Sequence, residues 1–400
     1  MQHIILFDSD IRDSLLPLTF TRPVSDLRLG ILTIKDKWAH LFEEASFSHI
    51  TAEALEPLFP INIQDENILI NSAVIPSSTL QYRIANLQPN EAIMLDGELI
   101  ATRLLRHQFE YLLDGSDLED ITGYELTEDV QMIRHLWELP SISKNQITAD
   151  MQLLSMSGHF YPKDLQIRGD HPVFVHPSAR LDSAILNAEE GPIFIGEEAW
   201  IMDGSILRGP IAIGQHSVVR MGAKLFGGTV AGPKCVLGGE VKNSTLLGYS
   251  NKAHEGYLGD SIIGEWCNLG ALTSNSNVRN TLSAVPVWNY ADRTRQESGQ
   301  VKCGVFMGDY CRTAILAQLG AGSSIGVSCH LYGSGTCPPS VPSFTWGGME
   351  SMHIYQLERA IQVAMKAQAS KGMIMGQGHQ DLLRTIFLDT QSDRANFPDS

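Results

Sequence analysis

A six-residue repeat of aliphatic residues runs through the C-terminal half of the chain. It includes Ile195, Ile201, Leu207, Ile213 and Val219, and the same spacing recurs in the pairs Val230 and Val236, Ile263 and Leu269, and Leu319 and Ile325. A period of six matches neither the helical period of about 3.6 residues nor the strand period of about 2. It is the period of a hexapeptide β-helix, in which three short strands complete a triangular coil and one aliphatic residue per hexad points inward. We therefore predict a left-handed parallel β-helix.

Glycines in the repeat, an interruption of the repeat and the helical patterns after it predict where its corners and its ends lie. Glycine follows the inward aliphatic residue at several coils, where we expect tight corners with unusual backbone angles; the pairs are Ile195-Gly196, Ile213-Gly214, Ile263-Gly264 and Ile325-Gly326. The repeat is interrupted between about residues 273 and 303, which predicts an excursion around Trp288, Asn289 and Tyr290. Helical patterns over 349–369 and 382–388 predict a cap on the last coil.

The N-terminal segment has a different pattern. Strands are predicted at 4–7 and 68–75 and a helix at 31–42, and the Asp96-Gly97 pair between two apolar runs indicates a hairpin. Strands mixed with helices favour an α/β, Rossmann-like layer structure. We thus expect an α/β domain over 1–165, a β-helix over 170–340, and a helical cap and tail over 345–400.

Composition excludes several classes of partner. The net charge of −16 repels nucleic acid and anionic lipid surfaces. No apolar run approaches the roughly 20 residues that span a bilayer, and the first residues lack the basic start of a signal peptide. The 6 cysteines are dispersed, which fits reduced thiols in a cytoplasm. We expect a cytoplasmic protein without a nucleic-acid or membrane partner.

Residues 252–277 combine the groups that acyl transfer needs. His254 is suited to accept a proton near neutral pH, and a backbone N–H in the Gly270-Ala271 turn could stabilise a thioester oxyanion. Arg220 and Lys242 are candidate cations for a sugar phosphate. We predict that the β-helix is an acyltransferase.

These motifs carry a family resemblance. The runs GGEVKNS, KAHEGYLGD and NLGALTSNSN, together with TRPVSDLRLGILTIKDKW near the start, resemble a divergent bacterial group of GlmU-type bifunctional enzymes. Such enzymes acetylate glucosamine 1-phosphate with acetyl-CoA and then uridylylate the product. The resemblance implies a homotrimer whose acetylation sites lie between neighbouring prisms.

The resemblance also implies a role for each matched residue. His254 falls where the family has its general base, and the acetyl-CoA contacts fall on Ala271 and Asn277. The positions that hold the sugar phosphate fall on Arg220, Lys242, Tyr257 and Asn268. The chain departs from the family pattern after Asn277, where 278–280 read Val-Arg-Asn.

For the N-terminal domain the resemblance implies nucleotidyl transfer with UTP and Mg²⁺. Arg22, Arg28 and Lys37 are the candidate phosphate-binding residues, since such transfer depends mostly on positioning and on cations. A solvated helix face is the structural alternative for these cations. Where the family has a Gly-Asp pair, this chain has Asn71-Ser72, so the metal ligand stays unassigned among Asp8, Asp10, Asp96 and other carboxylates.

Three alternatives stay open. The chain could be an acetyltransferase with an inactive nucleotidyltransferase domain, or a non-catalytic β-helix that binds sugar nucleotides and scaffolds a partner. A zinc-dependent β-helix enzyme would need three convergent histidines. The candidates for such a zinc site are His171, His176, His216 and His254, whose spacing does not suit one.

Overall fold

The computed structural model describes residues 2–113, 121–127, 130–156 and 166–398. The described chain forms two compact units, one from Met1–Asp13, Arg22–Leu27 and Leu32–Arg134, the other from Ser14–Thr21, Arg28–Ile31 and His135–Ser400. The predicted domain boundary at residue 165 lies outside the described residues. No helix within the described ranges is long and apolar enough to cross a membrane.

The first unit is built on a six-stranded mixed sheet in the order β4-β1-β5-β7-β6-β8. Its core includes Ile5, Leu69, Leu104 and Phe109. Strand β1 lies between the parallel strands β4 and β5, and β7 runs antiparallel to both β5 and β6. The strands are β1 (His3–Phe7), β4 (Ser46–Ile50), β5 (Glu66–Asn71), β6 (Glu91–Leu95), β7 (Glu98–Leu105) and β8 (Thr122–Glu125), with the short strand β3 (Leu32–Thr33) outside the sheet. This is the predicted α/β class.

Short helices connect these strands. Helix α2 begins at a capping box in which Thr33 and Asp36 bond to each other's backbone N–H. The predicted hairpin is present, with positive φ at both Asp96 and Gly97, as a tight two-residue turn requires. The helical segments of this part are α1 (Ile11–Ser14), η1 (Val24–Asp26), α2 (Ile34–Leu41), η2 (Glu53–Leu55), α3 (Ser78–Ala85) and α4 (Arg106–Leu113).

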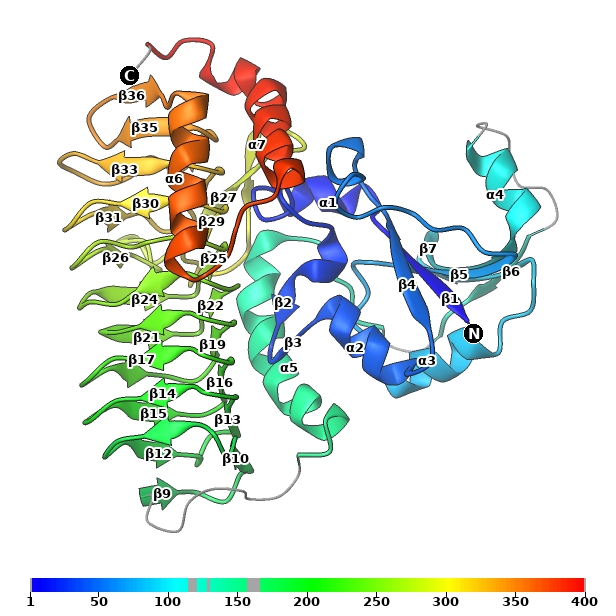
Figure 1. Ribbon diagram of the computed structural model, residues 1–400, viewed down its shortest axis with the longest axis horizontal. Helices are drawn as coiled ribbons and strands as arrows, with labels where there is room; N and C mark the ends of the chain where they lie inside the picture. The colour runs from blue at the N-terminus through cyan, green and yellow to red at the C-terminus, as the bar shows by residue number, and fades with distance from the viewer. Residues whose placement is uncertain (1, 114–120, 128–129, 157–165, 399–400) are drawn as a thin grey trace. The chain divides into compact units, whose positions relative to one another are not determined.

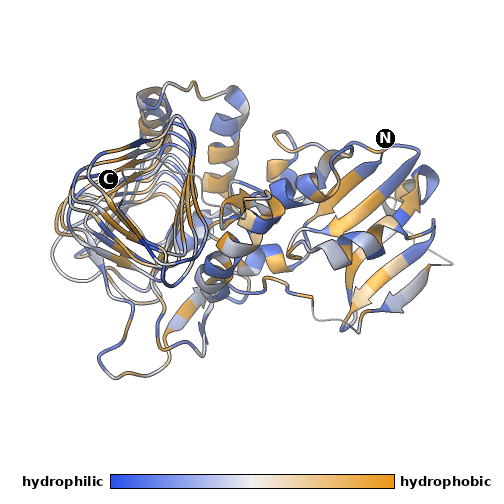
Figure 2. Cartoon of the chain, turned by 90° about the horizontal axis from the view of Figure 1, so that it is seen from below, coloured by the Kyte–Doolittle hydropathy of each residue, from blue (hydrophilic) through white to orange (hydrophobic). Residues whose placement is uncertain are grey.

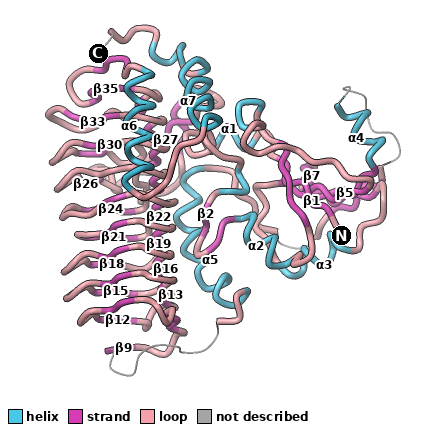
Figure 3. The backbone as a smooth tube through the Cα atoms, viewed as in Figure 1, coloured by secondary structure: helices cyan, strands magenta, loops and turns pink. Residues whose placement is uncertain are grey.

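The second unit is a left-handed parallel β-helix, in which each coil contributes one strand to each of three faces (Figure 1, Figure 3). Viewed along the stack, the coils superimpose (Figure 2). The first face is a nine-stranded sheet. Its strands are β10 (Val173–Val175), β13 (Ile193–Ile195), β16 (Ile211–Ile213), β19 (Thr229–Ala231), β22 (Thr245–Leu246), β25 (Ile262–Ile263), β29 (Phe306–Met307), β32 (Ser324–Ile325) and β34 (Ser340–Val341).

The second face continues through an isolated bridge at Asn268, which joins its lower and upper sheets. Its strands are β11 (Arg180–Leu181), β14 (Trp200–Ile201), β17 (Val218–Val219), β20 (Val236–Leu237), β23 (Asn251–Lys252), β30 (Arg312–Thr313), β33 (His330–Tyr332), β35 (Thr345–Gly348) and β36 (Met352–Ile354). The third face consists of β9 (Gln166–Arg168), β12 (Ile185–Asn187), β15 (Ile206–Arg208), β18 (Lys224–Leu225), β21 (Glu240–Lys242), β24 (Tyr257–Gly259), β26 (Ser274–Asn275) and β31 (Gln318–Leu319).

The interior of the prism is a column of aliphatic side chains. Each residue of the run 195, 201, 207, 213 and 219 is fully buried, as predicted. The pair Val230 and Val236 was assigned the wrong register, because Val230 packs outside the prism against Ile147. The inward residues there are Leu225, Ala231 and Leu237, so the six-residue series continues without a break.

The corner glycines are needed for a reason other than the predicted one. None of Gly196, Gly214, Gly264 and Gly326 has a positive φ. A Cβ at Gly214 or Gly326 would lie 2.8 or 2.3 Å from backbone atoms of the next coil. Close stacking of adjacent coils therefore excludes side chains at these positions. The left-handed residue of each corner lies two positions later, as at Glu198, His216, Trp266 and Ser328.

Helices and a hairpin cover parts of the prism. Helix α5 (Leu139–Leu153), preceded by η3 (Leu136–Glu138), packs on the first face, where Ser143 Oγ lies 2.9 Å from Thr245 Oγ1. The short strand β2 (Arg28–Leu29) also belongs to this unit. The predicted excursion contains the antiparallel strands β27 (Pro286–Asn289) and β28 (Thr294–Glu297).

The terminal helices are α6 (Leu357–Ser370) and α7 (Gln377–Asp389), followed by η4 (Gln391–Arg394). Helix α6 begins later than the sequence predicts, because 352–354 form a strand that pairs with β35. Its end is fixed to the coils by Lys371, whose Nζ donates to Lys234 O and Asn251 Oδ1, each at 2.9 Å.

The upper end of the prism provides a test of the packing. The His330 ring packs against Trp346 and Tyr355, whose ring centroids lie 5.0 and 4.6 Å from its own. Burial, together with the positive charges of Arg312 and Arg359, lowers the pKa of His330 to about 4. An unfolded histidine has a pKa of about 6.5, so the unfolded chain binds a proton that the folded chain does not. Stability is therefore expected to fall as the pH decreases from about 6.5 towards 4.

We predict that His330→Phe keeps the ring contacts and reduces this acid loss of stability. The measurement is the urea midpoint of wild type and variant at several pH values across that window. His171→Gln, at an exposed position, is the control and should keep the wild-type pH dependence. An unchanged pH dependence in His330→Phe would contradict the assignment.

Candidate functional site

Three predicted residues lie on one edge of the β-helix, between the second and third faces, which we call the second corner. Arg220 follows β17, His254 lies in the turn between β23 and β24, and Ala271 lies in the corresponding turn of the next coil. Leu272 N donates to Glu255 O at 2.8 Å, which places the last two turns directly beside each other. Arg220 is two coils before His254, or about 10 Å along the stack at the usual strand spacing. Arg220 and His254 are both exposed.

The Ala271 N–H is available at this corner. The neighbouring amides are used: those of Leu269, Gly270 and Leu272 donate to Asn251 O, Thr313 Oγ1 and Glu255 O. No group of the described chain accepts a hydrogen bond from Ala271 N. The amides of Met221 and Ile315, at the same place in other coils, are likewise unused, so the free amide is a property of this turn. An exposed imidazole and a free N–H on adjacent coils can act as a general base and as a hydrogen-bond donor to an oxyanion.

Three other predicted residues lie together on the third face. Asn277 Nδ2 donates to Tyr257 Oη at 3.1 Å and also to Asp260. Lys242 is the strand partner of Gly259. A Cβ on Gly259 would lie 2.1 Å from Tyr257 Oη, so the tyrosine ring lies across this glycine. Tyr257, Asn277 and Lys242 therefore share one patch.

Electrostatics around Tyr257 favour the neutral phenol. Burial raises the pKa of Tyr257, and the negative charges of Asp260 and Glu240 raise it further, while the Asn277 hydrogen bond lowers it. The tyrosine is thus a hydrogen-bonding group rather than a base at neutral pH. The buried Asp260 also accepts from Asn243 Nδ2 at 2.7 Å. The sequence interpretation missed Asp260 and Asn243, although YLGD and VKNS contain them.

Asn268 lies apart from this patch. It belongs to the second face, where it bridges Asn251 and Arg312, and its Oδ1 lies 3.5 Å from Asn251 Nδ2. Within one chain the predicted acceptor-binding residues therefore occupy two faces on either side of the second corner. Sequence spacing alone does not distinguish these faces.

Two of the four candidate zinc-binding histidines, His176 and His216, have separate partners. His216 Nδ1 is 3.0 Å from Glu198, and His176 Nδ1 is 2.8 Å from Ser178 Oγ. Across the described ranges, no group of three or more His, Cys, Asp or Glu side chains is arranged to hold a metal ion. The zinc-site alternative has no ligand set in this part of the chain.

In the first unit, polar residues meet at the carboxyl ends of β1, β4 and β5. Asp8 accepts from Thr51 Oγ1 at 2.6 Å and from Val24 N at 3.1 Å. Burial raises the pKa of Asp8, while its hydrogen bonds with Thr51, Val24 and Ser72 lower it. Ligands of open α/β sheets bind at this edge. Asp8 is therefore the carboxylate best placed at a candidate nucleotide site.

The three predicted nucleotide-binding residues are divided between the two units. Arg22 is buried, and its charge acts on Asp26. Lys37 is only 1% exposed within α2. Arg28 belongs to the second unit, where Nε donates to Leu247 O at 3.3 Å and Nη1 donates to Ile31 O. Because Lys37 is buried, the alternative of a solvated helix face does not hold for this residue.

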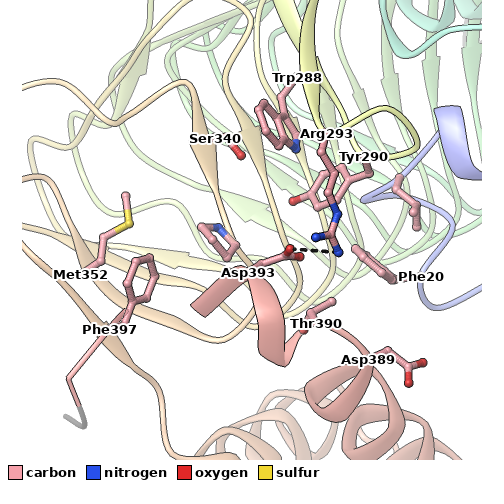
Figure 4. Close-up of a pocket in the computed structure, with 12 residues that line it drawn as sticks. Phe20, Trp288, Tyr290, Arg293, Ser340, Met352, Asp389, Thr390, Asp393 and Phe397 are labelled. Atoms are coloured by element: carbon pink, nitrogen blue, oxygen red, sulfur yellow. Dashed lines mark ion pairs between the residues drawn. The ribbon is translucent and has the colours of Figure 1, made fainter. Parts of the chain in front are cut away.

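A cavity of about 490 Å³ lies beside the excursion hairpin and the C-terminal segment (Figure 4). Its walls include Phe20, Trp288 and Tyr290, and Arg293 pairs with Asp393 at 3.5 Å. Ser340 and Pro342 place the cavity next to the last strand of the first face, opposite the second corner. None of the predicted site residues lines it.

Comparison with known proteins finds similarity over parts of the chain. Residues 4–158 match the model of the sugar nucleotidyl transferase family. The chain is 39% identical over 90 residues to the bifunctional protein GlmU of Methanocaldococcus jannaschii, a match that covers 22% of this chain and 21% of that protein. It is 34% identical over 145 residues to a bifunctional sugar-1-phosphate nucleotidylyltransferase/acetyltransferase of Sulfurisphaera tokodaii, covering 36% of each chain.

A third relative, GlmU of Trichormus variabilis, is 27% identical over 194 residues, covering 47% of this chain and 40% of that protein. The matches thus span between a fifth and two-fifths of the relatives' own lengths. Among solved structures, the polysialic acid-specific acetyltransferase NeuO superimposes with a TM-score of 0.29 at 11% identity, covering 51% of this chain and 97% of that one. The chain is thus similar to GlmU-type bifunctional proteins over part of their length, and its residues 4–158 match the sugar nucleotidyl transferase family model.

Proposed function

We propose that this chain is an acetyl-CoA-dependent N-acetyltransferase that acts on an amino sugar 1-phosphate, with glucosamine 1-phosphate as the acceptor. The observation that carries the proposal is the second corner, where the exposed His254 lies one coil from the free N–H of Ala271. Sequence similarity to GlmU-type proteins supports the choice of the sugar phosphate as acceptor and of acetyl-CoA as donor. The proposed localisation is cytoplasmic.

In the proposed reaction the amine nitrogen attacks the thioester carbonyl, and His254 accepts the proton that nitrogen loses. The new C–N bond gives a tetrahedral oxyanion, which the Ala271 N–H stabilises. Collapse breaks the C–S bond and releases coenzyme A, whose thiolate takes up a proton. Arg220 and Lys242 neutralise the sugar phosphate, Tyr257 and Asn268 orient it, and Asn277 contacts the coenzyme while holding Tyr257.

We also propose a homotrimer. Tyr257 and Asn268 lie on different faces of one chain, so a site that uses both needs a second prism beside the second corner. Apolar side chains crowd this corner, and exposed apolar patches commonly mark interfaces. The exposed fractions are 69% for Met221, 51% for Leu272, 68% for Ile315 and 62% for Leu316.

For the first unit we propose transfer of a uridylyl group from UTP to the sugar phosphate, at the edge that carries Asp8. Mg²⁺ is expected to bind mainly through substrate phosphates and one or two carboxylates. Asp8 accepts one hydrogen bond at each oxygen, which leaves one lone pair on each oxygen for a cation, and we assign it no metal-dependent step. Arg22 and Lys37 are buried, and the alternative to this proposal is an active acetyltransferase with an inactive first unit.

We predict that His254→Ala lowers kcat/KM for acetyl transfer by about 10²- to 10⁴-fold, because it removes the proton acceptor. Thiol release from acetyl-CoA with glucosamine 1-phosphate measures this reaction. His216→Ala, on another corner, should keep wild-type activity. Full activity in His254→Ala would overturn the proposed mechanism. No thiol release by wild type would favour the scaffold alternative instead.

Gly259→Ala tests the acceptor patch without removing a functional group. The new methyl would collide with the Tyr257 ring, so the tyrosine must rotate away from Asn277. We expect KM for the sugar phosphate to rise by about tenfold, as loss of one good hydrogen bond would give. Gly376→Ala, where a Cβ has no neighbour within 4 Å, is the control. An unchanged KM would remove Tyr257 from the acceptor site.

Asp8→Asn tests the first unit. Asparagine keeps the shape and one acceptor oxygen, but it removes the charge. We expect pyrophosphate release from UTP, sugar phosphate and Mg²⁺ to slow by about tenfold or more, equivalent to about 1.4 kcal/mol, with acetyl transfer unchanged. Asp10→Asn, at the exposed position two residues later, is the control. If the wild type releases no pyrophosphate, the alternative of an inactive first unit holds. Lys37→Ala is a weaker test, because Lys37 is buried and its substitution also risks misfolding.

A further inference from the structure

Two polar side chains interrupt the aliphatic column behind the second corner. The inward position on the second face is aliphatic in most of the coils from β14 to β33. In chain order the residues there are Ile201, Val219, Leu237, Lys252, Leu269, Thr313 and Leu331. Lys252 and Thr313 are buried, with exposures of 2% and 7%. They lie next to the turns that carry His254 and Ala271.

Lys252 is bonded to the turns from inside the prism. Its Nζ donates to His254 O at 3.0 Å and to Gly238 O at 2.9 Å, so it links the turns of two successive coils. Burial lowers the pKa of Lys252 to about 8; the nearby charge of Glu255 raises it, and that of Lys224 lowers it. An inward ammonium group is a costly substitute for leucine. Packing of the column therefore does not explain this residue.

Thr313 makes the corresponding contact one coil further on. Its Oγ1 accepts from Gly270 N at 2.9 Å and lies 2.7 Å from Thr273 Oγ1. Thr273 Oγ1 is also 3.2 Å from Ala314 O. The amide of Gly270, the residue before Ala271, is thus held by a side chain of the following coil, while the Ala271 N–H itself stays free.

We infer that Lys252 is a positioning residue that fixes the turn of His254 by binding its carbonyl from within the prism, with Thr313 fixing the adjacent Gly270-Ala271 turn. The inference rests on the proposed acetyl transfer. Lys252 acts through the backbone, because its Nζ is directed to two carbonyls inside the prism and not to the exposed corner. Its loss should therefore affect the placement of the imidazole more than the binding of substrates.

The test is Lys252→Met, which keeps an unbranched side chain in the column but removes both donors. We expect kcat for acetyl transfer to fall by about tenfold to a hundredfold, as small misplacements of a catalytic group do, with KM for acetyl-CoA and for the sugar phosphate nearly unchanged. Leu237→Met, at the same inward position one coil earlier, is the matched control and should keep kcat. An unchanged kcat in Lys252→Met, or a loss expressed only in KM, would overturn the inference.

Hydrogen exchange followed by mass spectrometry separates this inference from the proposed function. Glu240 N donates to Gly256 O at 3.2 Å, and Leu272 N donates to Glu255 O at 2.8 Å, so both amides report on the turn. In Lys252→Met they should exchange faster than in wild type, and in Leu237→Met they should not. If wild type lacks acetyl transfer but these amides respond, the proposed function fails and the positioning role stands. Unchanged exchange in Lys252→Met overturns the positioning role itself.

Discussion

The stacked column of inward aliphatic residues is the constraint on which the second unit depends. Each coil presents three such residues, and an isolated coil cannot bury them by itself. Stacking removes them from water on both sides, and full burial of one such side chain is worth about 1.5–3 kcal/mol. The parallel pairing of strands on all three faces keeps successive inward residues in register. Regular corners follow from that register.

The corners illustrate how close stacking selects residue types. Glycine occupies positions where a Cβ would meet the backbone of the next coil, whereas the left-handed conformation falls on larger residues such as Tyr249, Trp266 and Tyr310. At one corner these three rings stack on each other, with centroid separations of 4.1 and 6.4 Å. Contacts between neighbouring coils therefore offset the backbone strain at these positions.

Departures from the regular column coincide with the proposed site. Lys252 and Thr313 bind the turns of the second corner, and the buried Asn275 bonds to Gly259 N and O beside Tyr257. Successive coils of a β-helix are otherwise nearly identical. Polar inward residues are a means by which this fold can distinguish one set of turns from the others, because they add hydrogen bonds that the aliphatic coils lack.

The sequence by itself determined the fold class, because a period of six is a local property that only a triangular coil satisfies. It also identified the α/β pattern of the first unit and the Asp96-Gly97 hairpin. Tertiary structure decided what depends on the neighbours of a residue. It turned Val230 outward against α5, buried Lys37, and bound Arg28 to the backbone of the second unit. It also divided Tyr257 and Asn268 between two faces, since spacing along the chain counts residues but not the corners between them. Lys252 lies six residues from each of the inward Leu246 and Leu258, yet only the stacked coils show the two carbonyls that it binds.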